Sequence, residues 1–527
     1  MPVLTLYSTN MYQINAGQIL RSILLSCVGT AAFLLLLWFI LKDLEWAALA
    51  TSLIAILFFN YGRASASVSL FHERYLLPRG ILPDPDRLMM VSHIVLFTLW
   101  LLVGVLGVVL FKRAEVWRPQ ITQYFALLGI VAIFFPALKI FRYHIDLSNP
   151  TDIQDSAQTR DVEMQGDASL PDIYYIILDA YGREDVLQDV YQYDNSPFLN
   201  QLQSLGFHVT SESRSNYSLT WLSIASSLNM NYMEQLMEFP TTDPMCIPLV
   251  SQQLASGEVL QFLKQHGYQT FAIATRFDPT EIREADRYIF SEWYGLNSFE
   301  SLMLRNSFFN LLYDVSSMLN GPLEYPGYRT HRDHIHFILD TLAQMPDEPG
   351  PKFVFAHILS PHPPFIFGSN GETLKQRLPY SIFDGDEYPG SEEEYLKGYR
   401  DQVSYINGRI QDLARHLIED SEMAPIIILQ GDHGPKSSME GKQITYDVFK
   451  ETVAILNAYY FPDGEYDALY PSISPVNSFR IVLNHFFNQD YDILPDLSYF
   501  TTDPCGETME LLPEEDELEA YFENREN

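Results

Sequence analysis

Four long apolar stretches near the start of the chain constrain its fold more than any other feature. They run over residues 19–41, 46–61, 91–111 and 121–141, and only Arg21 interrupts the first. A helix needs about 20 apolar residues to cross the hydrocarbon core of a bilayer, and most of these stretches approach that length. We therefore predict a bundle of about four transmembrane helices within residues 1–145, with the lipid bilayer as a partner.

The charges beside these helices leave the orientation in the membrane open. A literal count of lysine and arginine places the soluble part of the chain in the cytoplasm. The densest short basic loop, Lys112 to Arg118, nevertheless lies on the opposite side from the soluble part. The opening segment from Met1 to Tyr7 is also apolar, and we hypothesise that it is the end of one more spanning helix.

The rest of the sequence predicts a linker, an α/β domain and an acidic tail. Residues 146–170 are polar and have almost no apolar periodicity, which is typical of a linker. Over residues 171–505 strand patterns alternate with helix patterns, which indicates a mostly parallel sheet flanked by helices. Residues 506–527 are rich in acidic side chains, which is typical of an acidic tail. The whole chain has a formal net charge of −34, which argues against nucleic acid as a partner.

Three continuous apolar runs have the composition of strands buried on both faces. They cover residues 173–178, 353–359 and 426–429. Residues 259–266 and 393–417 have apolar positions at helical spacing, so we expect helices there.

Three cysteines occur, at Cys27, Cys246 and Cys505, with no C-x-x-C pair. This count indicates neither a disulfide framework nor a cysteine zinc site. Cys246 and Cys505 can form a disulfide if the soluble part faces an oxidising space, and the sequence leaves that pairing open.

Polar residues follow each of the three strand patterns. Asp179 follows the first, His362 comes just after the second, and Asp432 with His433 follows the third. Ligands of open α/β sheets bind beyond the carboxyl ends of the strands, so these side chains can converge on one point. Oxygen and imidazole ligands suit a hard or borderline divalent cation, and the pattern predicts a metal site.

Each of these residues also has an ordinary structural alternative. Asp179 alone is typical of a helix cap or turn. The Asp432–Gly434 segment fits a turn in which the glycine supplies a positive φ, and His362 fits a rigid loop among prolines. His357 alternates with phenylalanines in a strand pattern, which favours a buried core histidine.

A hydroxyl-rich segment, Ser215–Asn-Tyr-Ser-Leu-Thr220-Trp-Leu-Ser223, turns into a helix pattern. A hydroxyl at a helix N-terminus lies beside unbonded N–H groups and the positive end of the helix dipole, where it can attack a bound phosphoryl or sulfuryl group. Helix starts also use Ser and Thr as ordinary caps. In addition, Asn216-Tyr-Ser218 matches a glycosylation sequon.

Taken together, these residues resemble the alkaline phosphatase superfamily, and within it the membrane-bound sulfatase-like branch that includes lipoteichoic acid synthases and phosphoethanolamine transferases. The resemblance covers about residues 171–484 and the plan of several helices ahead of them. It implies that Asp179, Thr220, Asp432 and His433 bind one divalent metal, with zinc, manganese, magnesium and calcium not distinguished. The resemblance also implies a multi-pass protein of the cell membrane with an extracytoplasmic catalytic domain.

The same resemblance implies roles in catalysis and substrate binding. Thr220 is the expected nucleophile, and His362, in a Ser-x-His-x-Pro-like setting, is the expected catalytic residue on the substrate side. We predict that His362, His357 and Arg183 bind substrate. A second metal involving His362 and His357 stays open, because no further histidine closely follows Asp432-His433-Gly434.

One departure from the family's sequence motif reduces the number of possible activities. Formylglycine sulfatases have Cys or Ser in a C-x-P-S-R or S-x-P-S-R motif, whereas this chain has Thr220-Trp-Leu-Ser223-Ile, so that maturation is chemically unavailable. We expect a phosphoester hydrolase or phospho-group transferase that forms a phospho-threonine and passes the group to water or a hydroxyl acceptor on envelope lipids or polymers. A sulfatase using unmodified threonine and a catalytically silent membrane scaffold are the alternatives.

Overall fold

The computed structural model describes residues 1–75, 85–148, 170–236, 246–291, 295–319, 321–376, 380, 382, 388, 390–437, 445–501, 509–513 and 521. The chain forms two compact units. One combines Met1–Asn149 with Tyr294–Thr330 and Lys375–Ser381, and we call it the membrane unit. The other combines Pro150–Trp293 with His331–Leu374 and Ile382–Asn527, and we call it the sheet unit.

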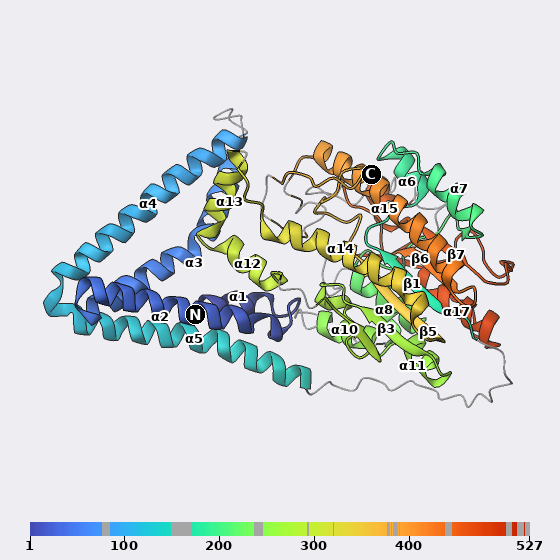
Figure 1. Ribbon diagram of the computed structural model, residues 1–527, viewed down its shortest axis with the longest axis horizontal. Helices are drawn as coiled ribbons and strands as arrows, with labels where there is room; N and C mark the ends of the chain where they lie inside the picture. The colour runs from blue at the N-terminus through green and yellow to red at the C-terminus, as the bar shows by residue number, and fades with distance from the viewer. Residues whose placement is uncertain are drawn as a thin grey trace. The chain divides into compact units, whose positions relative to one another are not determined.

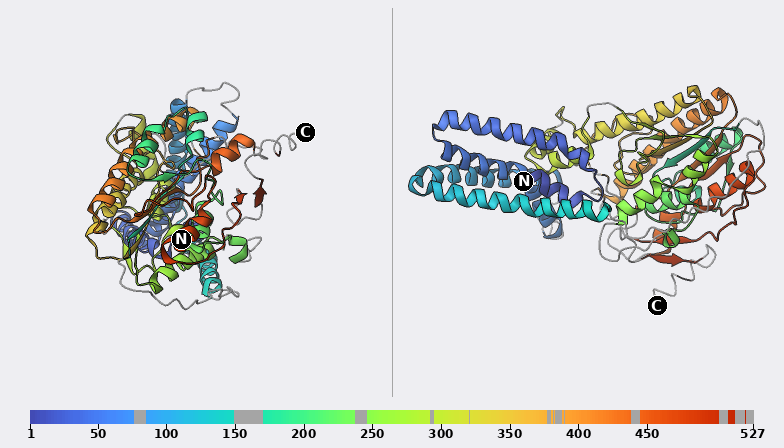
Figure 2. Two further views of the ribbon diagram at one scale, coloured as in Figure 1. Left: turned by 90° about the vertical axis from the view of Figure 1, so that its right-hand side faces the viewer. Right: turned by 90° about the horizontal axis from the view of Figure 1, so that it is seen from below.

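Four long helices make up most of the membrane unit. They are α2 (Leu20–Leu41), α3 (Leu44–Tyr75), α4 (Pro85–Arg113) and α5 (Arg118–Ser148). Each contains a stretch that is long and apolar enough to cross a membrane. Their surfaces are covered with exposed apolar side chains such as Phe39 and Leu102, as a surface that faces lipid tails requires. Helix α3 contacts the other three (Figures 1 and 2). The four predicted spans are thus confirmed by length and composition.

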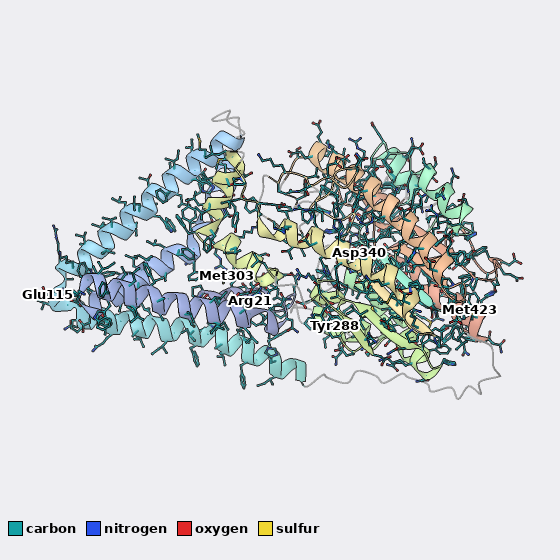
Figure 3. All side chains as sticks on the ribbon, viewed as in Figure 1. Arg21, Glu115, Tyr288, Met303, Asp340 and Met423 are labelled. Atoms are coloured by element: carbon teal, nitrogen blue, oxygen red, sulfur yellow. The ribbon has the colours of Figure 1, made fainter. Side chains whose placement is uncertain are left out.

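Helices from the middle of the sequence also belong to the membrane unit. These are α12 (Ser298–Asn306) and α13 (Phe309–Met318), which pack with α1 (Pro2–Asn10), η1 (Ala16–Ile19) and the long helices. Helix α12 begins with a capping box between Asn297 and Glu300. Glu300 also forms an ion pair with Arg21 of α2, which lies 279 residues away in the sequence (Arg21 is labelled in Figure 3). The charge that interrupts the first apolar stretch is therefore neutralised by α12.

A seven-stranded sheet forms the centre of the sheet unit, in the order β2-β7-β6-β1-β5-β3-β4. The strands are β1 (Ile173–Leu178), β2 (His208–Val209), β3 (Gln269–Ile273), β4 (Arg287–Ile289), β5 (Lys352–Ile358), β6 (Ile426–Gly431) and β7 (Asn457–Tyr460). Only the pairs β6–β7 and β2–β7 are antiparallel. All residues of β1, β5 and β6 are buried, so the three predicted strands and the mostly parallel sheet are confirmed.

Helices cover both faces of this sheet (Figures 1 and 2). On one face α8 (Thr220–Asn229), α10 (Cys246–Ala255), α11 (Glu258–Gln265) and α17 (Pro475–Phe487) share an apolar core with Ile173, Tyr175 and Ile177 of β1. The other face carries α7 (Ser196–Ser204), α14 (Pro326–Gln344) and α15 (Glu392–Asp420). The helices predicted over residues 259–266 and 393–417 are confirmed as α11 and α15. Shorter helices include α6 (Glu184–Asp189), α9 (Met233–Leu236) and α16 (Tyr446–Val453).

Some expectations fall on parts of the chain that are not described. Residues 149–169 of the predicted linker and most of the predicted acidic tail lie outside the described residues. Within the tail, β9 (Glu510–Leu512) pairs with β8 (Ser498–Phe500) in a small antiparallel sheet. Cys246 is disulfide-bonded and Cys27 is free, while Cys505, the partner considered for Cys246, lies outside the described residues.

Candidate metal centre and nucleophile

The register of the central strands brings the predicted metal ligands to one edge of the sheet. Leu178 at the end of β1 pairs with Ile358 on β5 and with Gly431 on β6. Asp179 and Asp432 are the next residues along β1 and β6, and therefore leave the sheet at the same level. The geometry follows from parallel pairing of three buried strands, which places their carboxyl ends together.

Asp179, Asp432 and His433 form a compact, buried group. One potential ligand atom of each lies within 4.8 Å of the others. His433 Nε2 is 3.5 Å from Asp432 Oδ2 and 3.8 Å from Asp179 Oδ1. His433 Nδ1 lies 2.8 Å from the carbonyl oxygen of Gly434. Because a carbonyl only accepts, Nδ1 carries the proton and Nε2 turns its lone pair toward the two carboxylates.

The carboxylates are incompletely satisfied by the protein. Asp432 Oδ1 accepts the Ala180 N–H at 3.0 Å, whereas Asp432 Oδ2 and Asp179 Oδ1 have no hydrogen-bond donor among the residues that the structure describes. Buried acceptors without donors are costly, and a cation would satisfy both. Two carboxylates and a neutral imidazole match the ligands of hard or borderline divalent metals. These residues therefore fit the predicted metal, although their role as ligands stays a prediction.

The local electrostatics keep these groups in the protonation states that metal ligands need. Burial alone would raise the pKa of Asp179, but the neighbouring His362, His357 and His433 outweigh burial and hold that pKa below its ordinary value. Burial lowers the pKa of His433. At neutral pH the site thus presents an anionic Asp179 and a neutral His433.

Thr220 is the first residue of α8 and lies against this group. Its Oγ1 is 3.1 Å from His433 Nε2, and its side chain is buried. One turn later, Ser223 donates from Oγ to the backbone carbonyl of Asp432 at 2.6 Å. This hydrogen bond ties the start of α8 to the loop after β6. The structure thus brings the predicted nucleophile to the predicted metal ligands.

Gly434 serves close packing. A Cβ at this position would collide with the carbonyl oxygen of Glu451, and the Gly434 N–H donates to the Thr452 carbonyl at 2.6 Å. Gly434 does not have the positive φ that the turn alternative required. Because Gly434 has no side chain, the loop after β6 can pack directly against α16.

The two substrate-side histidines occupy different environments. His362 is partly exposed, its Nδ1 donates to the Pro363 carbonyl at 2.5 Å, and its ring centroid is 6.2 Å from that of His433. His357 is completely buried, with Nε2 3.3 Å from Asp179 Oδ2 and Nδ1 2.9 Å from Thr280 Oγ1. His357 thus has the burial of a core histidine while contacting a predicted metal ligand. The substrate-binding role of both residues stays a prediction.

Arg183 is buried and forms an ion pair with Asp185. Its Nε lies 2.8 Å from Asp185 Oδ1, and its Nη1 donates to the Ser213 carbonyl at 3.3 Å. These contacts give the guanidinium a structural function in the loop after β1. Its predicted role in substrate binding is therefore not needed to explain its position, and stays a prediction.

Sequence reasoning missed two residues of α15 that position the site loops. Gln402 is buried and donates from Nε2 to the backbone carbonyls of Pro361 at 3.1 Å and His362 at 3.0 Å. Tyr399 donates from its hydroxyl to the Ala180 carbonyl at 2.8 Å. The sequence feature that could have identified these two residues is the presence of a glutamine and tyrosines on the otherwise apolar face of the helix predicted over residues 393–417.

The sequon alternative does not agree with the fold. Asn216 is completely buried, and its Nδ2 donates to Ser474 Oγ at 3.0 Å and to the Leu497 carbonyl at 2.9 Å. An asparagine held inside the protein in this way supports the loop ahead of α8.

Comparison with known families decides which of the expected families is present. A family model described as Sulfatase matches residues 171–479, which is more than half of the chain. The chain belongs to the sulfatase family. The predicted resemblance to the alkaline phosphatase superfamily and its sulfatase-like branch is thereby confirmed. The matched residues cover most of the sheet unit and also include residues 294–330 and 375–381 of the membrane unit. A comparison with curated protein sequences found no match.

Solved structures similar to this chain include transferases and sulfatases. The C-terminal periplasmic domain of EcEptC from Escherichia coli, in complex with Zn, is 12% identical with a TM-score of 0.40, over 65% of this chain and 92% of that one. The integral membrane protein lipooligosaccharide phosphoethanolamine transferase A from Neisseria meningitidis is 11% identical with a TM-score of 0.40, over 89% and 86%. BT1596, a 2-O GAG sulfatase, is 12% identical with a TM-score of 0.40, over 61% and 71%.

Proposed function

We propose that this sulfatase-family protein is a membrane-anchored, metal-dependent phospho-group transferase or phosphoester hydrolase with Thr220 as its nucleophile. The observation that carries the proposal is the 3.1 Å contact between Thr220 Oγ1 and His433 Nε2, inside a buried cluster with two incompletely satisfied carboxylates. A hydroxyl that served only as a helix cap would have no reason to lie against such a cluster.

The cluster supports the activation of a weak nucleophile. Asp179, Asp432, His433 and Thr220 would hold a divalent cation, which when bound supplies positive charge that lowers the proton affinity of a hydroxyl and offsets charge on the transferring group. Thr220 would lose its hydroxyl proton to solvent and attack the phosphorus of a donor ester. A bond from Thr220 Oγ1 to phosphorus forms while the bond to the leaving oxygen breaks. The first N–H groups of α8, which have no partner within the helix, face the phosphoryl oxygens.

His362 is placed to assist the leaving group. Its ring centroid lies 6.2 Å from that of His433, and an imidazole at this position can carry a proton to the leaving oxygen. The phospho-threonine is then resolved by water in a hydrolase or by a hydroxyl acceptor in a transferase. Thr220 cannot be converted to formylglycine, which favours phosphate esters over sulfate esters as substrates.

Two observations support an extracytoplasmic domain that acts on envelope lipids or polymers. Four helices of spanning length precede the sulfatase domain in the chain. In addition, Cys246 is disulfide-bonded, and disulfides persist in oxidising compartments outside the cytoplasm. Both features agree with a soluble domain outside the membrane, and the bilayer makes a lipid-linked donor or an envelope acceptor accessible.

Parallel turnover assays on the full chain in detergent test this proposal. A phosphate monoester, a phosphodiester and a sulfate ester are offered after EDTA treatment and after re-addition of Zn²⁺, Mn²⁺ or Mg²⁺. We expect metal-dependent turnover of a phosphate ester that falls at least about 10³-fold in Thr220→Val, which keeps the side-chain shape without the hydroxyl. Faster turnover of the sulfate ester would indicate a sulfatase instead, and no turnover with any metal would indicate a silent scaffold.

A further inference from the structure

Helix α13 of the membrane unit has polar side chains on its inside and apolar side chains on its outside. Asn310 and Asp314 are 6% and 2% exposed. Phe309, Leu312 and Val315 are 41%, 46% and 38% exposed. Residues three apart in a helix lie on the same side, so these three apolar residues form one exposed face. A helix whose outer surface meets water has the opposite pattern, so the exposed face of α13 requires an apolar partner.

Hydrogen bonds fix the direction in which α13 faces. Asp314 Oδ2 accepts from Asn310 Nδ2 at 2.6 Å and lies 2.8 Å from His93 Nε2 of α4. The Tyr325 hydroxyl donates to the other oxygen of the same carboxylate. His93 Nδ1 in turn lies 3.2 Å from the Tyr61 hydroxyl of α3. Turning α13 about its axis would leave a buried carboxylate without its donors, which is costly, so the apolar face stays on the outside.

The start of α13 lies beside the apolar parts of two spanning helices, α3 and α4 (Figure 1). The Phe308 N–H donates to the Phe58 carbonyl of α3 at 2.7 Å. The Phe308 ring centroid is 6.1 Å from that of Phe97 on α4. Phe58 and Phe97 lie about two helical turns or more inside the nearer ends of the spans Leu44–Val68 and Met89–Arg113. The beginning of α13 is therefore at the depth of these apolar spans.

From this depth α13 runs along α4 toward the membrane surface. Asp314 contacts His93, which lies about one turn nearer the start of the α4 span than Phe97. Leu319, just after the end of α13, is 75% exposed and lies nearer that surface. Ile94 and Phe97 of α4 are themselves exposed, so the apolar face of α13 continues the surface that α4 presents to lipid. The acyl chains that cover α4 can therefore cover α13 as well.

We propose that α13 is embedded in the bilayer, with lipid acyl chains covering Phe309, Leu312 and Val315. Polar groups that face inward and apolar groups that face outward are what a helix in lipid requires. The embedded helix lies within residues 171–479, the part of the chain that matches the sulfatase family model. The sulfatase-family region is thus attached to the membrane by a segment of its own, in addition to the four helices that precede it. This attachment is independent of Thr220 and of the proposed reaction.

Spin labelling of the full chain in vesicles of phosphatidylethanolamine and phosphatidylglycerol tests this inference. The free Cys27 is replaced by serine, and labels are attached in turn to Leu312→Cys and Leu319→Cys. Power-saturation EPR then measures how often each label collides with oxygen and with a polar nickel chelate. Leu102→Cys on the exposed surface of α4 and Glu419→Cys on the exposed end of α15 are the references for lipid and water.

The expected result is a gradient of depth along α13. The ratio of oxygen to nickel collisions at residue 312 should match that of Leu102→Cys and exceed that of Glu419→Cys about threefold or more, because polar solutes are excluded from hydrocarbon. The ratio at residue 319 should lie between the two references. Val315→Cys repeats the measurement on the same face, so the inference is tested even if Leu312→Cys fails to fold.

Two results would overturn the inference. A ratio at residues 312 and 315 equal to that of Glu419→Cys would show that the face meets water. Exclusion of both oxygen and the nickel chelate from these positions would show that protein, such as a second copy of the chain, covers the face instead of lipid.

Discussion

Replacing Asp432 with asparagine is expected to stabilise the metal-free protein and to abolish its response to metal. The potential ligand oxygens of Asp179 and Asp432 lie within 4.8 Å of each other, and both residues are buried. Two like unit charges at that distance repel by about 3 kcal/mol at an effective dielectric constant of about 20. Asparagine keeps the shape of Asp432, and its Oδ1 can still accept the Ala180 N–H.

Thermal unfolding of the full chain in detergent measures both effects. After EDTA treatment at pH 8, relief of the repulsion should raise the free energy of unfolding by about 1–3 kcal/mol in Asp432→Asn, or the melting temperature by about 2–4 °C per kcal/mol. In the unchanged protein, metal at about 100 times its Kd should add about 2.7 kcal/mol. The variant should lose most of this second increase because it has lost an anionic ligand.

Glu281→Gln is the matched control. Glu281 is a buried carboxylate of the same unit that accepts the backbone N–H groups of Thr275 and Arg276 and is not part of the metal cluster. Its replacement should leave the metal-induced increase unchanged. A lower metal-free melting temperature in Asp432→Asn, or a metal-induced increase equal to that of the unchanged protein, would refute the electrostatic reasoning.

Three further outcomes follow from the structure. Burial lowers the pKa of His334 to about 3, so this residue's contribution to the stability of the folded domain should be complete above about pH 6.5 and should fall as the pH drops below that value. In thermal unfolding, His334→Gln should flatten this pH dependence. An unchanged pH profile in the variant would contradict this expectation. Glu300→Gln removes the carboxylate that pairs with Arg21 and should lower stability by about 1–3 kcal/mol, although Arg21 still donates to the Gly295 carbonyl. An Arg21→Leu/Glu300→Leu double variant should recover part of this loss, and a double variant no more stable than Glu300→Gln would contradict the ion pair. Gly434→Ala should lower metal content and activity, because a Cβ there would collide with the Glu451 carbonyl oxygen. Gly408→Ala is the control and should change neither, because a Cβ there meets nothing within 4 Å. Normal metal content in Gly434→Ala would contradict the packing argument.

The centre of the fold and the candidate site could be predicted because their signals are local. The strands β1, β5 and β6 are buried on both faces, so each is a continuous apolar run that stands out in the sequence. In a parallel sheet their carboxyl ends meet at one edge, which is why the sequence alone connects Asp179 with the Asp432-His433 pair. The spanning helices were equally visible, because the bilayer fixes their length and composition.

The membrane unit was only partly predictable because its remaining signals are non-local. Helices α12 and α13 have amphipathic patterns that also fit a soluble surface, and nothing near them in sequence indicates that they pack on spanning helices. Arg21 and Glu300 are 279 residues apart, so neither identifies the other. The roles of Tyr399 and Gln402 depend in the same way on contacts with distant loops, and the short strands β2, β4 and β7 have too few residues to show a period.

The most direct test of the central claim is to identify the covalent intermediate. The full chain is loaded with divalent metal, exposed briefly to a phosphate ester donor and quenched in acid, and its peptides are analysed by mass spectrometry. The account predicts a phospho-group attached to Thr220 that is absent after EDTA treatment and absent in Thr220→Val. Metal-dependent turnover with no adduct on Thr220, or full activity in Thr220→Val, would contradict it.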